Sequence, residues 1–418
     1  MVKLLMIADD FTGALDTGVQ FATRGAVTMV VTDPAYDFKQ AGEDVQVLVL
    51  DAETRHLSPG DAHDVVFRAV RDALDAGFTY IYKKTDSALR GNIGAELTAV
   101  MEAAGTDRLA FLPAFPKMNR VTRDGVHFIN EVPVAESVFG QDPFEPVRHS
   151  AISDIIAEQV ETPVVLHERM EQPNAKAQPG IQVYDAESDE DLMRIGLQLG
   201  TEGLHLSAGC AGFAAALATI LKLDGEAPAF PKLVPSLFIA CGSVNPVTLE
   251  QMRTATKAGF PHIHLNPVQK LEPSWLATED CAAAVRDWLD KAAAHRRCIL
   301  DVNDPDGCDD TTVYAREHGK TTEDLRVGIS TQLGHLMQKV LDGGLDATIL
   351  CTGGDTLLAL MRTVGVAELT PVCEVDTGAV LTSFVYHEKV YYIISKSGGF
   401  GEPDLFCRLA SLVGAEEE

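Results

Sequence analysis

The sequence predicts an α/β protein with two domains, each built on a mostly parallel sheet flanked by helices. Three observations predict this fold class. Short apolar runs alternate with longer stretches of helical spacing, a pattern typical of parallel sheets covered by helices. One proline-rich stretch near the middle separates two such series. The chain also has 418 residues, more than the roughly 100–200 residues of a typical domain.

The first series occupies the N-terminal half. Expected strands are residues 2–8, 27–32, 45–50, 79–83 and 109–112, and expected helices are residues 12–23, 61–76 and 95–104. Between residues 113 and 150 the alternation breaks into a stretch rich in Pro, Gly and Asn, where we expect a hairpin near residues 126–134. Strands at 182–184 and 205–207, a helix beginning near Ser188 and a helix at 211–221 complete the series.

The second series follows a segment with three prolines and little periodicity, residues 224–235. We place the first domain at residues 1–225, a linker at 226–235 and the second domain at 236–418. Expected strands are residues 237–240, 262–265, 298–302, 347–351 and 390–394, and the clear helices are residues 280–294 and 322–341.

Composition excludes several classes of function. The formal net charge is −27, which disfavours nucleic acid and anionic membranes as partners, and an anionic ligand would need a local basic pocket. None of the eight cysteines forms a CxxC pair, and several lie in apolar runs, as expected of free thiols in a reducing compartment. The N-terminal apolar run reaches Asp9 too soon for a signal peptide, and no apolar run approaches the ~20 residues of a membrane helix. We therefore expect a cytoplasmic protein.

Two adjacent carboxylates, Asp9 and Asp10, follow the first expected strand and precede a helix. Ligands of open parallel sheets bind at the carboxyl ends of the strands. A carboxylate there can accept hydrogen bonds from sugar hydroxyls or take a proton as general base. The alternative is that one of the two caps the helix, which accounts less easily for both.

Charged residues follow two further strands of the first series. Lys84 and Arg90 are cationic donors suited to a bound carboxylate, and Asp86 and Ser87 between them are suited to hydroxyls. Arg55 follows another strand. Each could belong to a polar surface loop, but three polar strand ends in one sheet predict one pocket. Residues 113–116, Arg120 and residues 142–144 form a third candidate, for which a rigid loop shaped by prolines is at least as good an explanation.

Three glycine-containing turns follow expected strands in the second half, at residues 241–246, 352–356 and 395–401. Glycine lets backbone N–H groups approach an anion, and a helix N-terminus adds a favourable dipole. Together the three turns favour a nucleotide site. Neither the phosphate-loop pattern GxxxxGK[ST] nor GxGxxG after a first strand occurs. The histidines show no HExxH or comparable spacing, and residues 304–310 read as a solvated acidic turn, so the metal ligands stay unassigned.

These motifs, from Asp9-Asp10 to Gly398-Gly399-Phe400-Gly401, together resemble those of the four-carbon acid sugar kinases, bacterial enzymes that phosphorylate acids such as threonate and erythronate or their 3-oxo forms. The resemblance implies an N-terminal acid-sugar domain, a C-terminal nucleotide domain, and ATP with Mg²⁺. The substrate residues expected from the motifs are Asp9, Asp10, Arg55, Lys84, Thr85, Asp86, Ser87 and Arg90. The expected nucleotide residues are Ser243, Gly353, Gly354, Asp355, Thr356, Ser397, Gly398 and Gly399.

Phosphoryl transfer to an alcohol needs in-line positioning, charge neutralisation and a carboxylate that takes the hydroxyl proton. We expect Arg55 and Lys84 to hold the acid, and Asp86 and Ser87 to orient its hydroxyls, which makes Asp86 part of the catalytic set. Asp10 is the expected general base.

Asp355 is the rival base, or it helps to hold Mg²⁺. Two other functions stay open: a non-enzymatic bilobed sensor of sugar acids, and a metal-dependent hydrolase or aldolase using Asp9 and Asp10. The expected partner is a small acid sugar, with neither nucleic acid nor membrane, and a homodimer is one candidate assembly.

Overall fold

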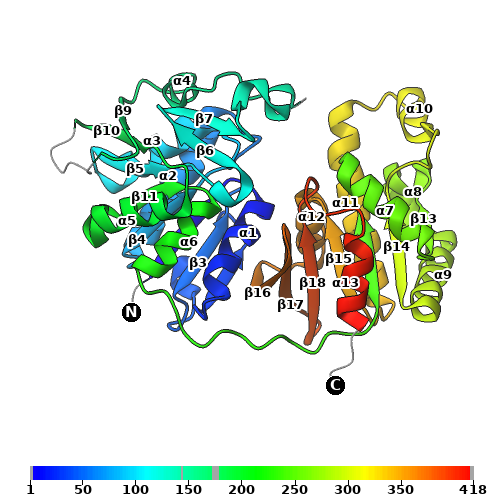
Figure 1. The fold of residues 1–418 in the computed structure, drawn as a ribbon. Coiled ribbons are helices and arrows are strands. Elements are labelled where there is room, and N and C mark those ends of the chain that lie inside the picture. The colour runs from blue at the N-terminus through cyan, green and yellow to red at the C-terminus, as the bar shows by residue number, and fades with distance from the viewer. Residues whose placement is uncertain (1–2, 143–144, 172–177, 415–418) are drawn as a thin grey trace. The chain divides into compact units, whose positions relative to one another are not determined.

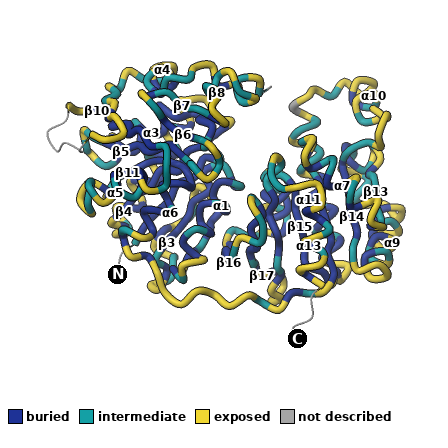
Figure 2. The backbone as a smooth tube through the Cα atoms, viewed as in Figure 1, coloured by how far each residue is buried: buried dark blue, intermediate teal, exposed yellow. Residues whose placement is uncertain are grey.

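The computed structural model describes residues 3–142, 145–171 and 178–414 (Figure 1). The chain divides into two compact units, Met1–Pro228 and Ala229–Glu418. The division falls inside the segment expected to be a linker, and residues 224–236 form neither helix nor strand. Figure 2 shows much of this segment as exposed.

The first unit is built on a parallel sheet. Among the described residues its strand order is β2-β3-β1-β4-β11-β5-β10-β9, with every pairing parallel. The strands are β1 Leu4–Ala8, β2 Thr28–Val31, β3 Val47–Asp51, β4 Tyr80–Lys84, β5 Arg108–Leu112, β9 Val164–His167, β10 Gly180–Tyr184 and β11 Leu206–Gly209. The strand β9, on the edge of the sheet, was not predicted from the sequence.

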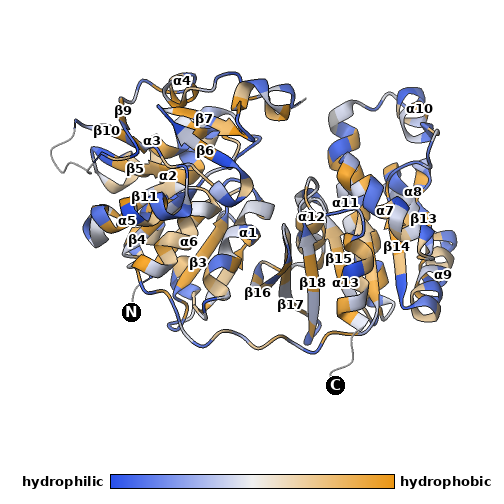
Figure 3. Cartoon of the chain, in the orientation of Figure 1, coloured by the Kyte–Doolittle hydropathy of each residue, from blue (hydrophilic) through white to orange (hydrophobic). Residues whose placement is uncertain are grey.

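Two groups of helices flank this sheet. Helices α2 (Pro59–Asp75), α3 (Ile93–Ala104) and α4 (Ile152–Ala157) pack together, and so do α1 (Phe11–Ala22), α5 (Asp189–Gly203) and α6 (Ala211–Ile220). One hydrophobic core of the unit joins Leu5 of β1 and Leu50 of β3 to Val66 of α2. Figure 3 shows β3 as largely hydrophobic, as expected for a strand of a parallel sheet that is covered on both faces.

A small antiparallel sheet occupies the stretch in which the alternation broke. It consists of β6 (Arg120–Arg123), β7 (Val126–Ile129) and β8 (Val132–Pro133). The expected hairpin is present as β7 and β8, and β6 adds a strand that was not predicted. Asn130 and Glu131 join β7 to β8 with φ angles of 49° and 64°, the left-handed conformation that tight hairpins require. Of the candidate loop segment 142–144, Pro143 and Phe144 lie outside the described residues.

The second unit has a mixed but mostly parallel sheet. Among its described residues the order is β13-β14-β12-β15-β18-β17-β16, in which the pairings from β13 to β18 are parallel and the pairings of β17 with β18 and with β16 are antiparallel. The strands are β12 Leu237–Cys241, β13 His262–His264, β14 Arg297–Asp301, β15 Thr348–Thr352, β16 Glu368–Asp376, β17 Ala379–Tyr386 and β18 Lys389–Lys396. The helices are α7 Pro246–Lys257, α8 Pro267–Leu271, α9 Glu279–His295, α10 Asp310–Glu317, α11 Thr322–Asp342, α12 Gly354–Val364 and α13 Leu405–Gly414.

The α/β class with two mostly parallel sheets is therefore confirmed. The sequence prediction missed β16 and β17. Strand β16 contains Pro371, which lies beside a register shift against β17, where a missing N–H is tolerated. No helix among the described residues is both long and apolar enough to cross a membrane.

Candidate functional site

The polar residues after three strands of the first unit lie at one edge of the sheet. Strand β1 lies between β3 and β4, and the last residue pairs in register are Ala8 with Asp51 of β3 and Ala8 with Lys84 of β4. Asp9 and Arg55, the latter on the loop after β3, consequently come within ion-pair distance of each other. The structure thus brings together the strand ends that the sequence predicted to share one pocket.

The centre of this edge is a buried ion cluster. The Arg55 guanidinium donates to both aspartates: Nε lies 2.8 Å from Asp9 Oδ2 and Nη1 lies 2.8 Å from Asp10 Oδ2. Lys84 Nζ bridges the same two carboxylates, at 3.4 Å from the Oδ1 atom of each. Arg55 and Lys84, which we expected to hold the acid, are therefore already paired with carboxylates of the chain.

The charges in this cluster stabilise one another. Burial alone would raise the pKa of Asp9, but the charges of Arg55, Lys84 and Lys83 outweigh it and lower the pKa to about 2. Burial opposes the charge of Lys84 too, yet Asp9 and Asp10 raise its pKa. The buried groups stay ionised at neutral pH because each faces an opposite charge.

Asp10 has two structural partners besides Arg55. Its Oδ1 atom accepts the backbone N–H of Gly13 at 3.0 Å and so caps helix α1, which is the alternative role that the sequence left open. A Cβ atom at Gly13 would lie 1.9 Å from Lys84 Nζ, so glycine leaves the space that the lysine occupies. The side chain of Asp10 is 24% exposed against 2% for Asp9, which makes Asp10 the more accessible carboxylate of the pair.

Asp86 is bound by a guanidinium fork. Arg90 Nε lies 2.8 Å from Asp86 Oδ2 and Arg90 Nη2 lies 3.2 Å from Oδ1. Burial would raise the pKa of Asp86, but Arg90 and Arg55 hold it well below its usual range. Arg90 also lies 3.3 Å from Asp142 Oδ2. Asp86 and Arg90 therefore neutralise each other. This ion pair gives Asp86 a structural role, whereas the sequence led us to expect that it orients substrate hydroxyls.

The remaining expected substrate residues differ in their placement. Thr85 is fully buried, and its hydroxyl donates to the carbonyl of Gly209 at 3.4 Å, which ties β4 to β11. Ser87 Oγ accepts a hydrogen bond from Arg120 Nη1. His127 Nε2 lies 2.9 Å from the Ser87 carbonyl oxygen, and burial lowers the pKa of this histidine to about 4, so it is neutral and donates there.

Arg120 has surroundings that the sequence did not predict, since a rigid loop shaped by prolines was at least as good an explanation for its segment. Among the residues that the structure describes, it has no carboxylate within ion-pair distance, and its buried Nε atom has no hydrogen-bond partner. Its guanidinium carbon lies 5.3 Å from the centre of the Phe139 ring, which the guanidinium of Arg90 also faces at 5.1 Å. Burial lowers the pKa of Arg120. A half-buried guanidinium without a carboxylate partner among the described residues, beside a balanced ion cluster, is suited to an incoming carboxylate.

The three glycine-containing turns of the second unit also lie together. Strands β12, β15 and β18 are neighbours, with Cys241 opposite Thr352 and Thr352 opposite Lys396. A Cβ atom at Gly242 would lie 1.9 Å from Thr356 Oγ1, and one at Gly398 would lie 2.9 Å from Ser243 Oγ. The turns therefore pack against one another at distances that only glycine permits.

Helix α12 begins directly after these turns. Gly353 at its N-terminus has a φ of 91° and offers no side chain to cap the helix. The first N–H groups of the helix are therefore available to donate hydrogen bonds to an anion. Thr356 in the first turn is buried at 2% exposure. Asp355 is 53% exposed and lies 3.3 Å from Arg326 Nη1.

Lys396 at the end of β18 was not among the nucleotide residues expected from the sequence, although it lies in the glycine-containing turn at residues 395–401. Its Nζ atom donates to Thr248 Oγ1 at 2.8 Å and to the Gly398 carbonyl at 3.0 Å. No carboxylate among the described residues pairs with it, and burial lowers its pKa to about 8. A buried ammonium without a carboxylate partner among the described residues, beside three glycine-containing turns, is suited to a phosphate.

Two family models match the chain: a sugar-binding N-terminal domain over residues 4–217 and a nucleotide-binding C-terminal domain over residues 238–406. The chain belongs to this two-domain family. The resemblance to four-carbon acid sugar kinases that the motifs indicated is confirmed, because relatives along the whole chain carry such names. The ion cluster and Arg120 lie in the sugar-binding range of the family, and the three turns with Lys396 lie in its nucleotide-binding range.

Three relatives illustrate this. A D-threonate kinase of Salmonella typhimurium is 29% identical over 424 residues, which cover 97% of each chain. A D-erythronate kinase of Heliobacterium modesticaldum is 27% identical and covers 97% of this chain and 96% of its own. A 3-oxo-tetronate kinase of Pseudomonas fluorescens is 25% identical, with 98% and 97% covered.

Solved structures agree with the family's fold. A Salmonella typhimurium protein described as a tRNA synthase has a TM-score of 0.81 at 20% identity and covers 98% of this chain and 99% of its own. A Haemophilus influenzae protein has a TM-score of 0.75 at 19% identity, with 98% and 100% covered. At these identities the likeness concerns the fold alone.

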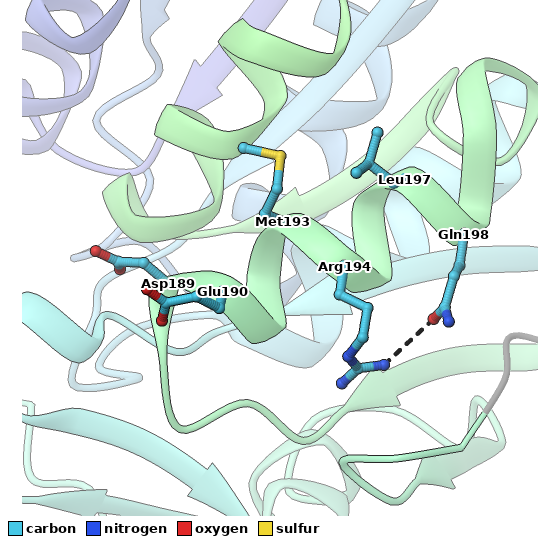
Figure 4. Close-up of a pocket in the computed structure, with 6 residues that line it drawn as sticks. All are labelled: Asp189, Glu190, Met193, Arg194, Leu197 and Gln198. Atoms are coloured by element: carbon cyan, nitrogen blue, oxygen red, sulfur yellow. Dashed lines mark hydrogen bonds between the residues drawn. The ribbon is translucent and has the colours of Figure 1, made fainter.

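A hollow of about 590 Å³ lies elsewhere, along helix α5 (Figure 4). Its lining side chains all come from that helix: Asp189, Glu190, Met193, Arg194, Leu197 and Gln198. Arg194 Nη1 donates to Gln198 Oε1 at 3.3 Å across it. It contains no residue of the ion cluster or the glycine-containing turns, so we do not assign the family's sugar or nucleotide site to it.

Proposed function

We propose that this protein is an ATP-dependent kinase that phosphorylates a hydroxyl of a four-carbon acid sugar, with D-threonate, D-erythronate and a 3-oxo-tetronate as candidate substrates. One observation carries the proposal: relatives aligned over nearly the whole chain are named as kinases of these acids. The two family models support a division of labour between a sugar-binding and a nucleotide-binding half. We keep residues 1–225 and 236–418 as the proposed domains.

We further propose that Arg120 receives the carboxylate of the acid. Arg55, Lys84 and Arg90 face the carboxylates of Asp9, Asp10, Asp86 and Asp142, so their charge is already balanced. A substrate carboxylate added to them would compete with ion pairs that the fold has formed. Arg120 offers a charge that no carboxylate of the described chain takes up, and the shape of its guanidinium matches a carboxylate. Arg55, Lys84 and the aspartates then orient the hydroxyls.

Asp10 remains the proposed general base. A carboxylate whose proton affinity is strongly suppressed makes a poor base, which counts against Asp9 and Asp86. The pKa of Asp9 is lowered to about 2 by Arg55 and lysines despite burial, and that of Asp86 is held well below its usual range by Arg90 and Arg55. Asp10 is the most exposed of the three aspartates, with a side chain 24% exposed against 2% for Asp9 and 8% for Asp86, so a substrate hydroxyl can reach it most easily.

For ATP, we propose that the N-terminus of α12, the turns around Ser243 and Gly398, and Lys396 hold the phosphates. These groups fit a polyphosphate because they combine backbone N–H donors with a buried cation that lacks a counter-ion. Mg²⁺, when bound with ATP, neutralises charge on the transferring phosphoryl group. Asp355 is the carboxylate in this region that could hold the ion, since it is half exposed and begins α12.

The proposal is tested by ADP release from ATP and Mg²⁺ with each of the three acids, followed by mass spectrometry of the product. We expect one or more acids to give ADP and a phosphorylated acid. A protein that binds an acid in calorimetry but releases no ADP with any of them would instead be a sensor. Turnover of an acid without ATP would favour the hydrolase or aldolase alternative.

A further inference from the structure

The second unit carries a group of side chains that the proposed kinase function does not use. His262 and His264 are two residues apart on β13, so their side chains share one face of the strand. Asp301 ends the neighbouring strand β14 and is the register partner of His264. One nitrogen of each imidazole and one carboxylate oxygen all lie within 4.8 Å of one another. The pattern of two histidines and one carboxylate is typical of sites for zinc and related divalent ions.

The carboxylate at the centre lacks a permanent counter-ion. Asp301 is 1% exposed, and among the described residues its ion-pair partners are the two imidazoles alone, with His262 Nε2 at 2.9 Å and His264 Nδ1 at 3.7 Å from Oδ2. Among the described residues no lysine or arginine pairs with this carboxylate, and a buried negative charge without a fixed opposite charge is costly. A divalent cation would supply the missing charge.

Asp301 and His264 each use one polar atom for hydrogen bonds within the protein, which leaves the other atom for a metal. Asp301 Oδ1 accepts hydrogen bonds from the backbone N–H of Asn303 at 2.9 Å and from its side-chain amide at 2.7 Å, which leaves Oδ2 for a ligand. His264 Nδ1 lies 2.9 Å from the Asn303 carbonyl, which can only accept, so this nitrogen carries the proton and Nε2 keeps its lone pair. Metal-binding histidines commonly donate their second N–H in this way.

His262 is oriented by a relay of hydrogen bonds. Its Nδ1 atom lies 2.9 Å from Thr256 Oγ1, and that hydroxyl lies 2.8 Å from the carbonyl of Met252. The Thr256 hydroxyl therefore fixes the ring of His262 with Nε2 facing Asp301 Oδ2, where a bound metal ion would take the place of the proton that these two atoms share. Ligands of a tetrahedral ion with bonds of ~2.0–2.1 Å lie roughly 3.3 Å apart. The 2.9 Å between His262 Nε2 and Asp301 Oδ2 therefore needs to lengthen only slightly.

From these contacts we propose that His262, His264 and Asp301 form a binding site for a divalent transition-metal ion of the zinc class. The site adjoins the first glycine-containing turn, because Asn303 Nδ2 donates both to Asp301 and, at 3.1 Å, to the Ser243 carbonyl. A bound ion would fix Asp301 and Asn303 and so stiffen that turn. The site is distinct from the proposed Mg²⁺ position, which would offer oxygen ligands, whereas imidazoles favour zinc.

The test is calorimetric titration of Zn²⁺ into the full chain after chelator treatment, with Co²⁺ absorption as a second readout of tetrahedral coordination. All proteins carry Cys308→Ser, since Cys308 is an exposed thiol that could bind zinc by itself. The test variant is H262Q with H264Q, and the control is H387Q, which removes an exposed histidine whose Nε2 lies 3.6 Å from Asp342. Thermal unfolding in chelator checks that each variant is folded.

We expect one Zn²⁺ per chain in the parent and in the control, and at least a 100-fold loss of affinity in the double variant. Zn²⁺ should also raise the melting temperature of the parent but not of the double variant, because an ion that binds only the native state stabilises it. Equal Zn²⁺ affinity in the parent and the double variant would overturn the proposal, and so would a parent that binds no Zn²⁺. None of these readouts depends on kinase activity.

Discussion

The assignment of Arg120 as the carboxylate receptor makes a prediction that separates binding from folding. In Arg120→Gln the side chain keeps a hydrogen-bond donor near Ser87, but it loses the positive charge and the paired N–H donors that can bind both oxygens of a carboxylate. Truncating a charge-assisted hydrogen bond to a bound carboxylate costs about 1.5–3 kcal/mol. At ~1.4 kcal/mol per decade, KM for the acid should rise roughly 10- to 150-fold. KM for ATP should stay near the value of the parent.

The folding stability of Arg120→Gln should change little, because among the described residues no carboxylate loses its partner. Arg55→Gln is the informative contrast. It leaves Asp9 and Asp10 without the guanidinium that lies 2.7 and 2.8 Å from them. Breaking a buried ion pair by removing one partner costs about 3–5 kcal/mol, so Arg55→Gln should unfold at clearly lower denaturant.

The assay is steady-state kinetics with acid varied at saturating ATP, together with urea unfolding of the same preparations. Arg123→Gln is the matched control, since this arginine lies on the same small strand β6 but pairs with Glu187 at 2.6 Å. If Arg120→Gln binds the acid as well as the control does, the carboxylate lies elsewhere. A fall in stability as large as that of Arg55→Gln would mean that the arginine is part of the ion cluster after all.

The remaining predictions concern the base, the phosphates and the buried Lys396. Asp10→Asn should keep ATP binding and lose about 10²–10⁴ in kcat, the usual share of general base catalysis. Asp355→Asn should instead alter the Mg²⁺ or ATP requirement. Near-normal turnover of Asp10→Asn at saturating ligands would show that Asp10 is not the general base. Lys396→Met should weaken ATP binding by calorimetry roughly 10-fold or more. Burial lowers the pKa of Lys396 from 10.5 to about 8, so the unfolded chain binds more protons between these values and the parent should gain stability from pH 8 to 10.5; a Lys396→Met protein with the same pH profile would contradict this. Gly242→Ala should impair ATP binding while sparing acid binding, because the added Cβ would lie 1.9 Å from Thr356 Oγ1; unchanged ATP affinity would show that the turns do not hold phosphate.

Much of the fold could be predicted from the sequence because buried parallel strands read as continuous apolar runs between helical patterns. The elements missed lack that signature. Strand β9 (Val164–His167) is half-buried, and β16 (Glu368–Asp376) alternates polar and apolar residues and contains Pro371. Such strands are defined by the neighbours with which they pair, and a local pattern contains little of that information.

The candidate site was predictable to the level of strand ends but not of partners. Asp9, Arg55 and Lys84 were expected in one pocket because each follows a strand of one sheet. Which cation pairs with which carboxylate depends on strand order, and the pair Arg55 and Asp9 is separated by 46 positions in the chain. The sequence therefore could not show that Arg55 and Lys84 are neutralised while Arg120 is not. For the same reason His262 and Asp301, which belong to different strands, carried no recognisable spacing.

The unpaired guanidinium of Arg120 also determines how an anion reaches the protein. The chain as a whole carries a formal charge of −27, so an approaching acid is repelled at long range and attracted only within the last few ångströms. Dissolved salt screens the long-range repulsion more than the short-range attraction, since the Debye length is about 10 Å at 0.1 M. Encounter with a small anion should therefore become faster as ionic strength rises, the reverse of the electrostatic steering seen when protein and ligand carry opposite charges.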